Sequence, residues 1–326
     1  MNASSWVVRA LSGLGALCTT MIGCASPSET PAAEGKSVAS APVIQDAPGI
    51  PGAKRFIFDR WTGPALPVWY LRPEGTPSTA PIVFVMHGVK RDADRYLSEW
   101  VATAREHGFV VVVPEFTSKA FPGANGYNFG GVFSDDGKEQ PRTQWSYSAI
   151  EPIFDAMREV EGLTSARYWL FGHSAGAQFV HRYAMLGLGP RMQGAISANA
   201  GSYMFATEGV RWPFGVAGAP GGHFDFVRAF SSPLMLLLGD ADIDPAHPSL
   251  PHQPEADKQG AYRFARGQNF YAQAREAAKN AKLKLQWSCL IAPGVAHEND
   301  KMATFAAAIM TSRVEPKPAA DCSVIR

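Results

Sequence analysis

Short, wholly apolar runs separated by longer amphipathic stretches extend through most of the sequence. Runs such as 82–86 and 109–113 carry no polar side chain, as expected for strands that are buried on both faces of a sheet. Stretches such as 93–107 and 146–161 place apolar residues at helical spacing. Because strands that alternate with helices form a mostly parallel sheet, we predict a doubly wound α/β fold with helices on both faces.

The same alternation continues to the end of the chain. Further strands are predicted at 68–71, 168–171, 194–198, 233–238 and 284–291, and further helices at 176–186, 268–281 and 299–313. Residues from about 200 to 230 are rich in Gly, Phe, Trp and Pro and fit neither pattern, so we expect a loop insertion there.

The N-terminal segment is predicted to lie outside the folded domain, which would span 54–326. An apolar stretch at 10–23 follows a single positive charge and is too short to span a bilayer, which indicates a signal peptide over 1–24. The stretch ends in Met21-Ile22-Gly23-Cys24, which resembles the lipobox of bacterial lipoproteins, where the Cys is diacylated. The alternative is simple cleavage near Cys24 and release of the protein.

Residues 25–53 are rich in Pro, Ala, Ser and Glu and lack apolar periodicity, so we expect a disordered linker. The domain would then be tethered to the bacterial cell envelope if Cys24 is lipidated, and would otherwise be periplasmic or extracellular. Two cysteines, Cys289 and Cys322, remain in the domain. An even pair in an exported chain predicts a disulfide that pins the C-terminal tail to the last predicted strand, with two free thiols as the alternative.

The charge balance gives no reason to expect a nucleic acid as partner. The 30 Lys and Arg residues offset 29 Asp and Glu residues, for a net charge of +1, and no block of like charges occurs. A Gly-rich phosphate-binding loop is also absent from the sequence, which argues against a nucleotide-dependent enzyme.

The sharpest motif is Gly172-His173-Ser174-Ala175-Gly176, which lies between a predicted strand and a predicted helix. A nucleophile elbow requires this context, because the tight turn exposes the serine hydroxyl and needs small residues such as Gly172 and Gly176 on either side. We therefore predict that Ser174 is a catalytic nucleophile and that the amide of Ala175 faces the oxyanion of a tetrahedral intermediate. The alternative is a tight turn with a buried serine.

A serine hydroxyl needs a general base, and His297 is the best placed of eight histidines. It directly follows the last predicted strand and is the last histidine in the chain, as the order Ser, acid, His requires. His173 is expected to pack beneath the elbow, and His181 to be structural. The remaining candidates in loops without a preceding strand are His223, His247 and His252.

Three aspartates follow the predicted strand at 233–238. Asp242 is favoured as the acid that orients the imidazole, with Asp240 and Asp244 as rivals. A calcium-binding loop is rejected, because its sixth and twelfth positions would be Gly and Glu, whereas two prolines stand there.

The second oxyanion donor is expected in the loop after an earlier strand. His87-Gly88-Val89 follows the predicted strand at 82–86, and the amide of Val89 is the predicted donor. The alternative is an ordinary glycine turn.

Together these pieces resemble the α/β-hydrolase superfamily, and within it the exported esterases grouped with polyhydroxybutyrate depolymerases and feruloyl esterases. The superfamily resemblance covers nearly all of 54–313. The esterase resemblance is carried by Val85-Met86-His87-Gly88-Val89, by the elbow with the run from Gly176 to Arg182, and by Ala198-Asn199-Ala200-Gly201. It implies hydrolysis of polyester or aryl-ester bonds, with no metal and no organic cofactor.

Aromatic residues in the predicted loops, Trp145, Tyr203 and Trp212 among them, predict an apolar substrate pocket, with the insertion lying over the active site. The expected activity is hydrolysis of carboxylic esters, small or polymeric, through an acyl-enzyme. The alternatives are a peptidase, lipase or lactonase on the same fold, and an inactive surface lipoprotein that binds a ligand.

Overall fold

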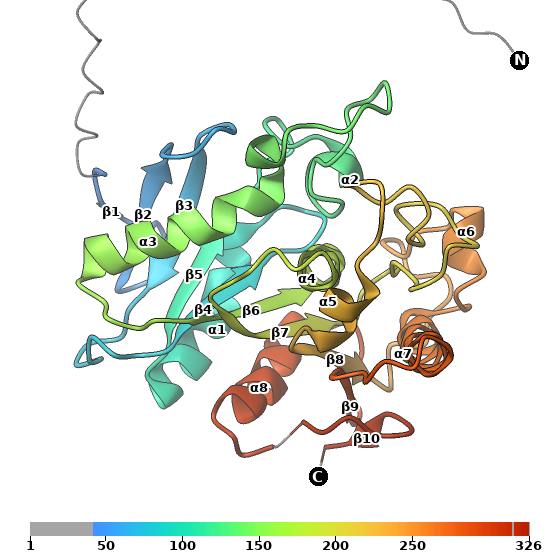
Figure 1. The fold of residues 1–326 in the computed structure, drawn as a ribbon. Coiled ribbons are helices and arrows are strands. Elements are labelled where there is room, and N and C mark those ends of the chain that lie inside the picture. The colour runs from blue at the N-terminus through green and yellow to red at the C-terminus, as the bar shows by residue number, and fades with distance from the viewer. Residues whose placement is uncertain (1–41, 315, 326) are drawn as a thin grey trace, which may run out of the picture. The chain divides into compact units, whose positions relative to one another are not determined.

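The computed structural model describes residues 42–314 and 316–325. These residues form a sheet of ten strands in the order β1-β2-β3-β5-β4-β6-β7-β8-β9-β10, with helices on both faces (Figure 1). The pairs that join β1, β2, β3 and β5 are antiparallel, and all the others are parallel. The predicted doubly wound, mostly parallel α/β fold is therefore confirmed.

The elements have the following bounds. The strands are β1 (Gln45–Asp46), β2 (Ala53–Phe58), β3 (Leu66–Leu71), β4 (Ile82–Met86), β5 (Val110–Pro114), β6 (Tyr168–His173), β7 (Met192–Ala198), β8 (Leu234–Gly239), β9 (Ser288–Ala292) and β10 (Ser323–Val324). The helices are α1 (Ala93–His107), α2 (Gly123–Gly126), α3 (Ile150–Glu161), α4 (Ala175–Met185), α5 (Phe226–Ser231), α6 (Pro254–Asp257), α7 (Arg263–Asn280) and α8 (Asn299–Met310), with 3-10 turns η1 (Arg142–Gln144) and η2 (Ser146–Ala149).

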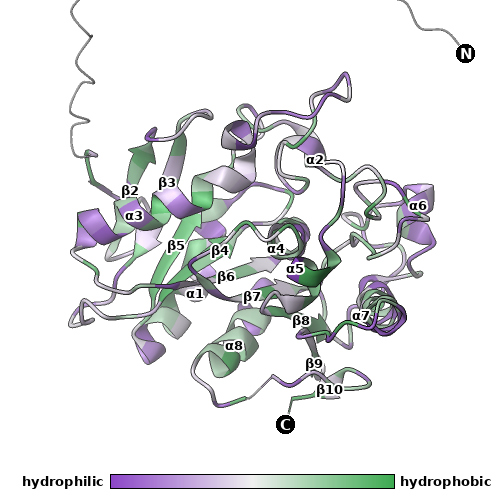
Figure 2. Ribbon diagram, viewed as in Figure 1, coloured by the Kyte–Doolittle hydropathy of each residue, from purple (hydrophilic) through white to green (hydrophobic). Residues whose placement is uncertain are grey.

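The central strands send side chains into two cores, one on each face of the sheet. Along β4, Phe84 belongs to the core formed with α3, α4 and α7, whereas Val83 and Val85 belong to the core formed with α1 and α8. All the residues of β4 and β5 are buried, which explains why those runs carry no polar side chain. Figure 2 shows apolar residues concentrated in the sheet and polar residues on the outer helix surfaces.

Helix α1 begins and ends where the sequence predicts. Gly108 follows it in the left-handed conformation, with φ of 66°, and donates its N–H to the carbonyl oxygen of Ala104. Trp100 is fully buried and meets Phe171 of β6, with ring centroids 4.9 Å apart. Truncating such a tryptophan usually destabilises a protein by about 3–5 kcal/mol, so this contact anchors α1 to the sheet.

Several predicted boundaries differ from the structure: the helices predicted at 146–161 and 299–313 span Ile150–Glu161 and Asn299–Met310. Helix α7 begins at Arg263, five residues before the predicted start at 268. The prediction missed its first turns because their buried side chains are polar and give no apolar periodicity. Residues 284–287 are not part of a strand, and the N–H of Gln286 donates to the carbonyl oxygen of Phe230, 2.8 Å away.

The folded chain also begins before the boundary predicted from composition. Ala47 and Ile50 are buried and β1 pairs with β2, so the end of the stretch 25–53 belongs to the domain. The predicted signal peptide, with its lipobox and Cys24, lies outside the described residues. In the described ranges, no helix combines the length and the apolar character that crossing a membrane requires.

The expected insertion is a loop region that lacks helices and strands between β7 and α5. It is held by Arg182 of α4, which is fully buried and donates from Nη2 to the carbonyl oxygen of Pro213, 2.8 Å away. The same guanidinium lies 4.6 Å from the ring centroid of Phe129. A buried cation that binds a backbone carbonyl thus fixes this loop to the helix after the elbow.

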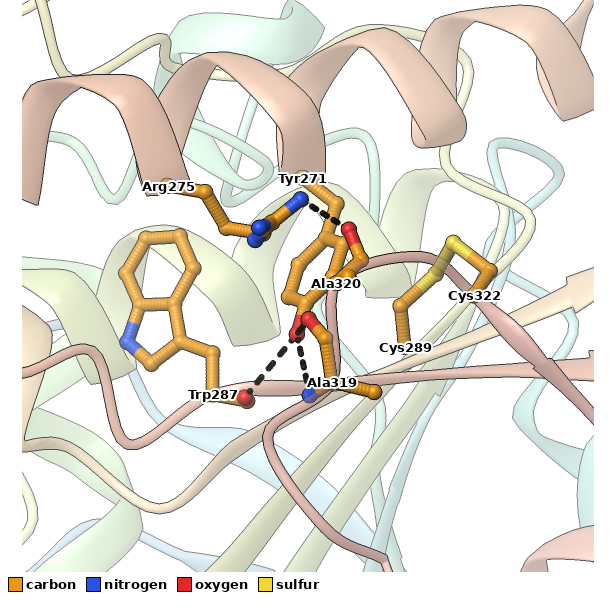
Figure 3. The surroundings of a disulfide bond; sticks show 7 residues. All are labelled: Tyr271, Arg275, Trp287, Cys289, Ala319, Ala320 and Cys322. Atoms are coloured by element: carbon orange, nitrogen blue, oxygen red, sulfur yellow. Dashed lines mark hydrogen bonds between the residues drawn. A yellow bond between two sulfur atoms is a disulfide. The ribbon is translucent and has the colours of Figure 1, made fainter. Parts of the chain in front are cut away.

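The C-terminal tail is fixed to β9 by the predicted disulfide between Cys289 and Cys322 (Figure 3). Tyr271 of α7 supports the same segment, because its hydroxyl donates to the carbonyl oxygen of Ala319, 2.9 Å away. Arg275, one turn further along α7, donates to the carbonyl oxygen of Ala320. The tail is therefore held covalently and by hydrogen bonds.

We predict that Cys322→Ser lowers the free energy of unfolding by about 3 kcal/mol, because the bond closes a loop of 33 residues in the unfolded chain. Urea denaturation of the variant and of the wild type, with and without reducing agent, checks this. Reducing agent should lower the stability of the wild type and leave the variant unchanged. Equal midpoints for the oxidised wild type and the variant would contradict the prediction.

Candidate active site

Ser174 lies on the sharp turn between β6 and α4. Its φ of 58° and ψ of −115° are rarely adopted by a residue with a side chain, and such strain costs of order 1–3 kcal/mol. Hydrogen bonds fix the turn on both sides: the N–H of Ser174 donates to Ala198 of β7 at 3.1 Å, and its carbonyl oxygen accepts from Gln178 at 3.3 Å. This is the conformation expected of a nucleophile elbow.

Two glycines make the turn possible. A Cβ atom at Gly176 would collide with the carbonyl oxygens of Met86 and His87, at the end of β4. A Cβ atom at Gly172 would collide with the backbone of Gly176 and the side chain of Val180. The absence of side chains at these two positions therefore lets α4 start directly against the sheet.

The imidazole of His297 and the carboxylate of Asp242 are joined by a hydrogen bond. Nδ1 of His297, in the loop between β9 and α8, lies 2.8 Å from Oδ2 of Asp242, in the loop after β8. The rival aspartates have other partners: Asp240 accepts from the N–H of Gly294 at 2.6 Å, and Asp244 accepts from the N–H of Ala246 at 2.8 Å. Of the three, only Asp242 meets the imidazole.

Ser174 and His297 line the same cavity, which has a volume of about 340 Å³. The other residues that line it are mostly polar: Gly88, Val89, Lys90, Arg95, Tyr96, His173, His247, Ser249 and Asn299. Within the described ranges, no hydrogen bond joins the Ser174 hydroxyl to His297. Because Nδ1 faces Asp242, Nε2 is the ring nitrogen left for the serine.

The two predicted oxyanion donors border this cavity from neighbouring strand ends. Val89 follows β4 and lines the cavity, and its N–H has no hydrogen-bond partner in the part of the chain described. Ala175 is the first residue of α4, so its N–H has no acceptor inside the helix. Both amides are therefore available to an external oxygen.

Burial and neighbouring charges set the protonation of the pair. Burial raises the pKa of Asp242, and the positive charge of Arg263, whose Nη1 lies 3.4 Å from Oδ1, opposes that rise. Burial, followed by the charges of Arg263 and His247, lowers the pKa of His297. The imidazole is consequently neutral near pH 7 and able to accept a proton.

Three other histidines have structural partners. Nδ1 of His173 lies 3.2 Å from the Tyr96 hydroxyl, and its ring packs on His297 with centroids 4.4 Å apart. His181 accepts the N–H of Met204 at 3.1 Å. His87 accepts the N–H of Phe116 at 3.0 Å, and burial lowers its pKa to about 4.

Trp145, Tyr203 and Trp212, the predicted pocket residues, do not line the cavity that contains Ser174. Tyr203 is fully buried and stacks on Phe270 of α7, Trp145 is buried, and Trp212 packs against Phe133. None of the lining residues comes from the insertion either. These rings pack the loops onto the helices, so they do not border the cavity of Ser174, and a role for them in binding substrate stays a prediction.

Two further residues lie next to the pair: Arg263, which the sequence analysis did not consider, and His247, which it named only as a less favoured base. Arg263 contacts Asp242, and the ring of His247 meets that of His297 edge to face, with centroids 5.0 Å apart. Arg263 lay outside the predicted helix at 268–281, and His247 follows no strand, so no local pattern marked either. Among the described residues, no group of three or more His, Cys, Asp or Glu side chains is arranged to hold a metal ion.

Comparison with known proteins gives the family. No family model and no curated protein matches the chain. Among solved structures, it is similar to poly(aspartic acid) hydrolase-1 from Sphingomonas sp. KT-1, with 38% identity over 80% of this chain and 98% of that one and a TM-score of 0.76. It is also similar to LpqC, a poly(3-hydroxybutyrate) depolymerase from Bordetella parapertussis, with 29% identity over 82% and 92% of the two chains and a TM-score of 0.74.

A siderophore hydrolase, EstB from Aspergillus nidulans, shares the fold at 15% identity, with a TM-score of 0.50 over 84% of this chain and 99% of that one. These neighbours are all hydrolases. With 38% identity across 98% of the Sphingomonas enzyme, the chain belongs to the α/β-hydrolases, in the same family as poly(aspartic acid) hydrolase-1.

Proposed function

We propose that this hydrolase cleaves carboxylic esters through an acyl-enzyme, with Ser174 as nucleophile, His297 as general base and Asp242 as the acid that orients it. The observation that carries the proposal is the shared cavity of Ser174 and His297, in which Nδ1 of the imidazole is held by Asp242 at 2.8 Å. Such an arrangement leaves Nε2 to take the serine proton.

The mechanism follows from these positions. The Ser174 hydroxyl attacks the ester carbonyl while Nε2 of His297 accepts its proton, and the amides of Val89 and Ala175 stabilise the oxyanion. His297 then protonates the leaving alcohol, and the same imidazole activates a water molecule that releases the acid. We expect the hydrogen bond between the Ser174 hydroxyl and Nε2 to form when substrate fills the cavity, since catalytic hydrogen bonds often tighten only in the complex.

A second candidate is hydrolysis of an acidic polyamide. The 38% identical neighbour is named for poly(aspartic acid), and Lys90, which lines the cavity, has no ion pair among the residues described. Its ammonium group would attract a carboxylate of such a polymer. The chemical steps are the same, except that His297 would protonate an amine as it leaves.

We also propose that the protein is exported. The Cys289–Cys322 disulfide supports this, because such bonds persist in oxidising compartments. Anchoring through a lipid on Cys24 remains a prediction from the sequence.

We predict that Ser174→Ala lowers kcat/KM for p-nitrophenyl butyrate by roughly 10³-fold or more, because no other group attacks the carbonyl. Ser197→Ala is the matched control: Ser197 is also buried, and its hydroxyl donates to Ala177 at 3.0 Å. That variant should lose about 1 kcal/mol of stability and keep its activity. If the Ser174→Ala enzyme keeps the wild-type activity, the proposed function is wrong.

Asp242→Asn should lower kcat by roughly 10⁴-fold, because an amide neither holds the required tautomer nor stabilises the imidazolium. Asp240→Asn is the control, since Asp240 binds the N–H of Gly294 and not the imidazole. Steady-state kinetics of both variants distinguish the two aspartates. A larger loss of kcat for Asp240→Asn than for Asp242→Asn would show that Asp240, and not Asp242, is the acid.

The two candidate substrates are separated by kcat/KM measured on p-nitrophenyl esters of graded length and on poly(aspartic acid). We expect cleavage of the esters by the wild type. If the polymer is cleaved as well, Lys90→Gln should raise KM for the polymer more than for the esters, because only the polymer carries carboxylates. An uncleaved polymer rejects the second candidate.

A further inference from the structure

We propose that Arg263 is a positioning residue that holds Asp242 ionised and correctly oriented for His297; this inference rests on the proposed function. Arg263 is the first residue of α7 and is fully buried. Its Nη1 lies 3.4 Å from Oδ1 of Asp242, the oxygen that His297 does not use. The carboxylate therefore lies between a guanidinium and an imidazole.

The start of α7 holds Asp242 through its backbone as well. The N–H of Phe264 donates to the carbonyl oxygen of Asp242, 3.2 Å away. Because the peptide group and the carboxylate of Asp242 are both bound to consecutive residues of one helix, rotation of its side chain is restricted. The placement of the acid is thus coupled to α7, which packs against β8 in the core.

Arg263 also spans the loop that follows the acid. Its Nη2 donates to the hydroxyl of Ser249 at 3.0 Å and lies 3.4 Å from Nδ1 of His247. The ring of His247 in turn meets the ring of His297 edge to face, with centroids 5.0 Å apart. One guanidinium therefore contacts the acid directly and supports the residue that packs on the base.

A buried arginine needs a nearby opposite charge, and Asp242, which is 3% exposed, is the carboxylate in contact with it. Conversely, a buried carboxylate without this cation would tend to take up a proton. A protonated Asp242 would no longer accept the Nδ1–H of His297 as a carboxylate and would not stabilise the imidazolium. The charge of Arg263 therefore matters to the reaction as well as to the fold.

Several other groups face the pair and set its electrostatic background. They are Arg95 of α1, His173 of β6, Tyr203 after β7, and Asp244 and His247 after β8. Lys90, after β4, and Tyr96 of α1 line the same cavity as His297. The cation of Arg263 lowers the pKa of both Asp242 and His297. Removing this cation raises both pKa values. As the pH falls, the active state, with neutral His297 and ionised Asp242, would therefore be lost at a higher pH than in the wild type.

The test compares Arg263→Gln and Arg263→Lys with Arg266→Gln in the full-length protein. Arg266 is a matched control: it lies on the same helix and is equally buried, but it donates to the carbonyl oxygens of Gly201 and Pro251 and pairs with Asp257. The readouts are kcat, the pH profile of kcat/KM on p-nitrophenyl butyrate, and thermal stability.

We expect Arg263→Gln to lower kcat by roughly 10- to 100-fold and to move the acidic limb of the profile upward by about one pH unit. Arg263→Lys keeps the charge and should keep the limb near its wild-type position, with a smaller loss of kcat. Arg266→Gln should lower the thermal stability and leave the acidic limb of the pH profile at its wild-type position. If a folded Arg263→Gln enzyme has its acidic limb at the same pH as the wild type, the inference is overturned.

A double-mutant cycle with Asp242→Asn makes the test independent of the Gln variant's folding. If Arg263 acts through Asp242, Arg263→Lys added to Asp242→Asn should cost less than Arg263→Lys alone. Additive losses contradict the inference. Ser174→Ala is measured beside these variants: if it is inactive while the Arg263 variants behave as the wild type, only this inference fails, and if it is active, the proposed function fails.

Discussion

The close approach of α4 to the end of β4 is the constraint on which the rest of the site depends. Side chains at Gly172 and Gly176 would collide with the neighbouring backbone, so the chain can reverse sharply only because both are absent. Ser174 is then forced to a positive φ of 58°. A strained residue persists only where its surroundings over-determine it. Here a fully buried helix, packed on β6 and β7, supplies that constraint.

The parallel sheet brings residues that are distant in sequence to one edge, and a single amide side chain links two of the loops there. Asn199 follows β7; its Oδ1 accepts the N–H of Gly239 at 2.8 Å, and its Nδ2 donates to the carbonyl oxygen of Ala296 at 3.0 Å. Gly239 ends the strand before Asp242, and Ala296 directly precedes His297. The separation of the proposed acid and base is therefore set by the strand ends and not by the loops alone.

Sequence patterns predicted the elements that have a local signature. The parallel strands β4 to β9, α1 with its glycine cap, and the positions of Ser174, Asp242 and His297 after strand ends all follow from periodicity and motif context. Arg263 and His247 could not be predicted, because their contacts join α7 to the loop after β8 and polar residues give no apolar period. For the same reason the sequence did not predict the first turns of α7. Strand β2 was not predicted either, because half of its residues are not buried and it lacks the continuous apolar run of the central strands.

The polar lining of the cavity changes how such a site can select a substrate. The aromatic rings expected there, Tyr203 among them, are used in packing, whereas Lys90, His173 and Asn299 line the cavity. A hydrophobic pocket discriminates weakly between substrates that differ by a methylene, whereas unpaired polar atoms strongly disfavour a ligand that cannot satisfy them. Selectivity at this site would therefore follow the polar groups that flank the scissile bond more than the length of an acyl chain.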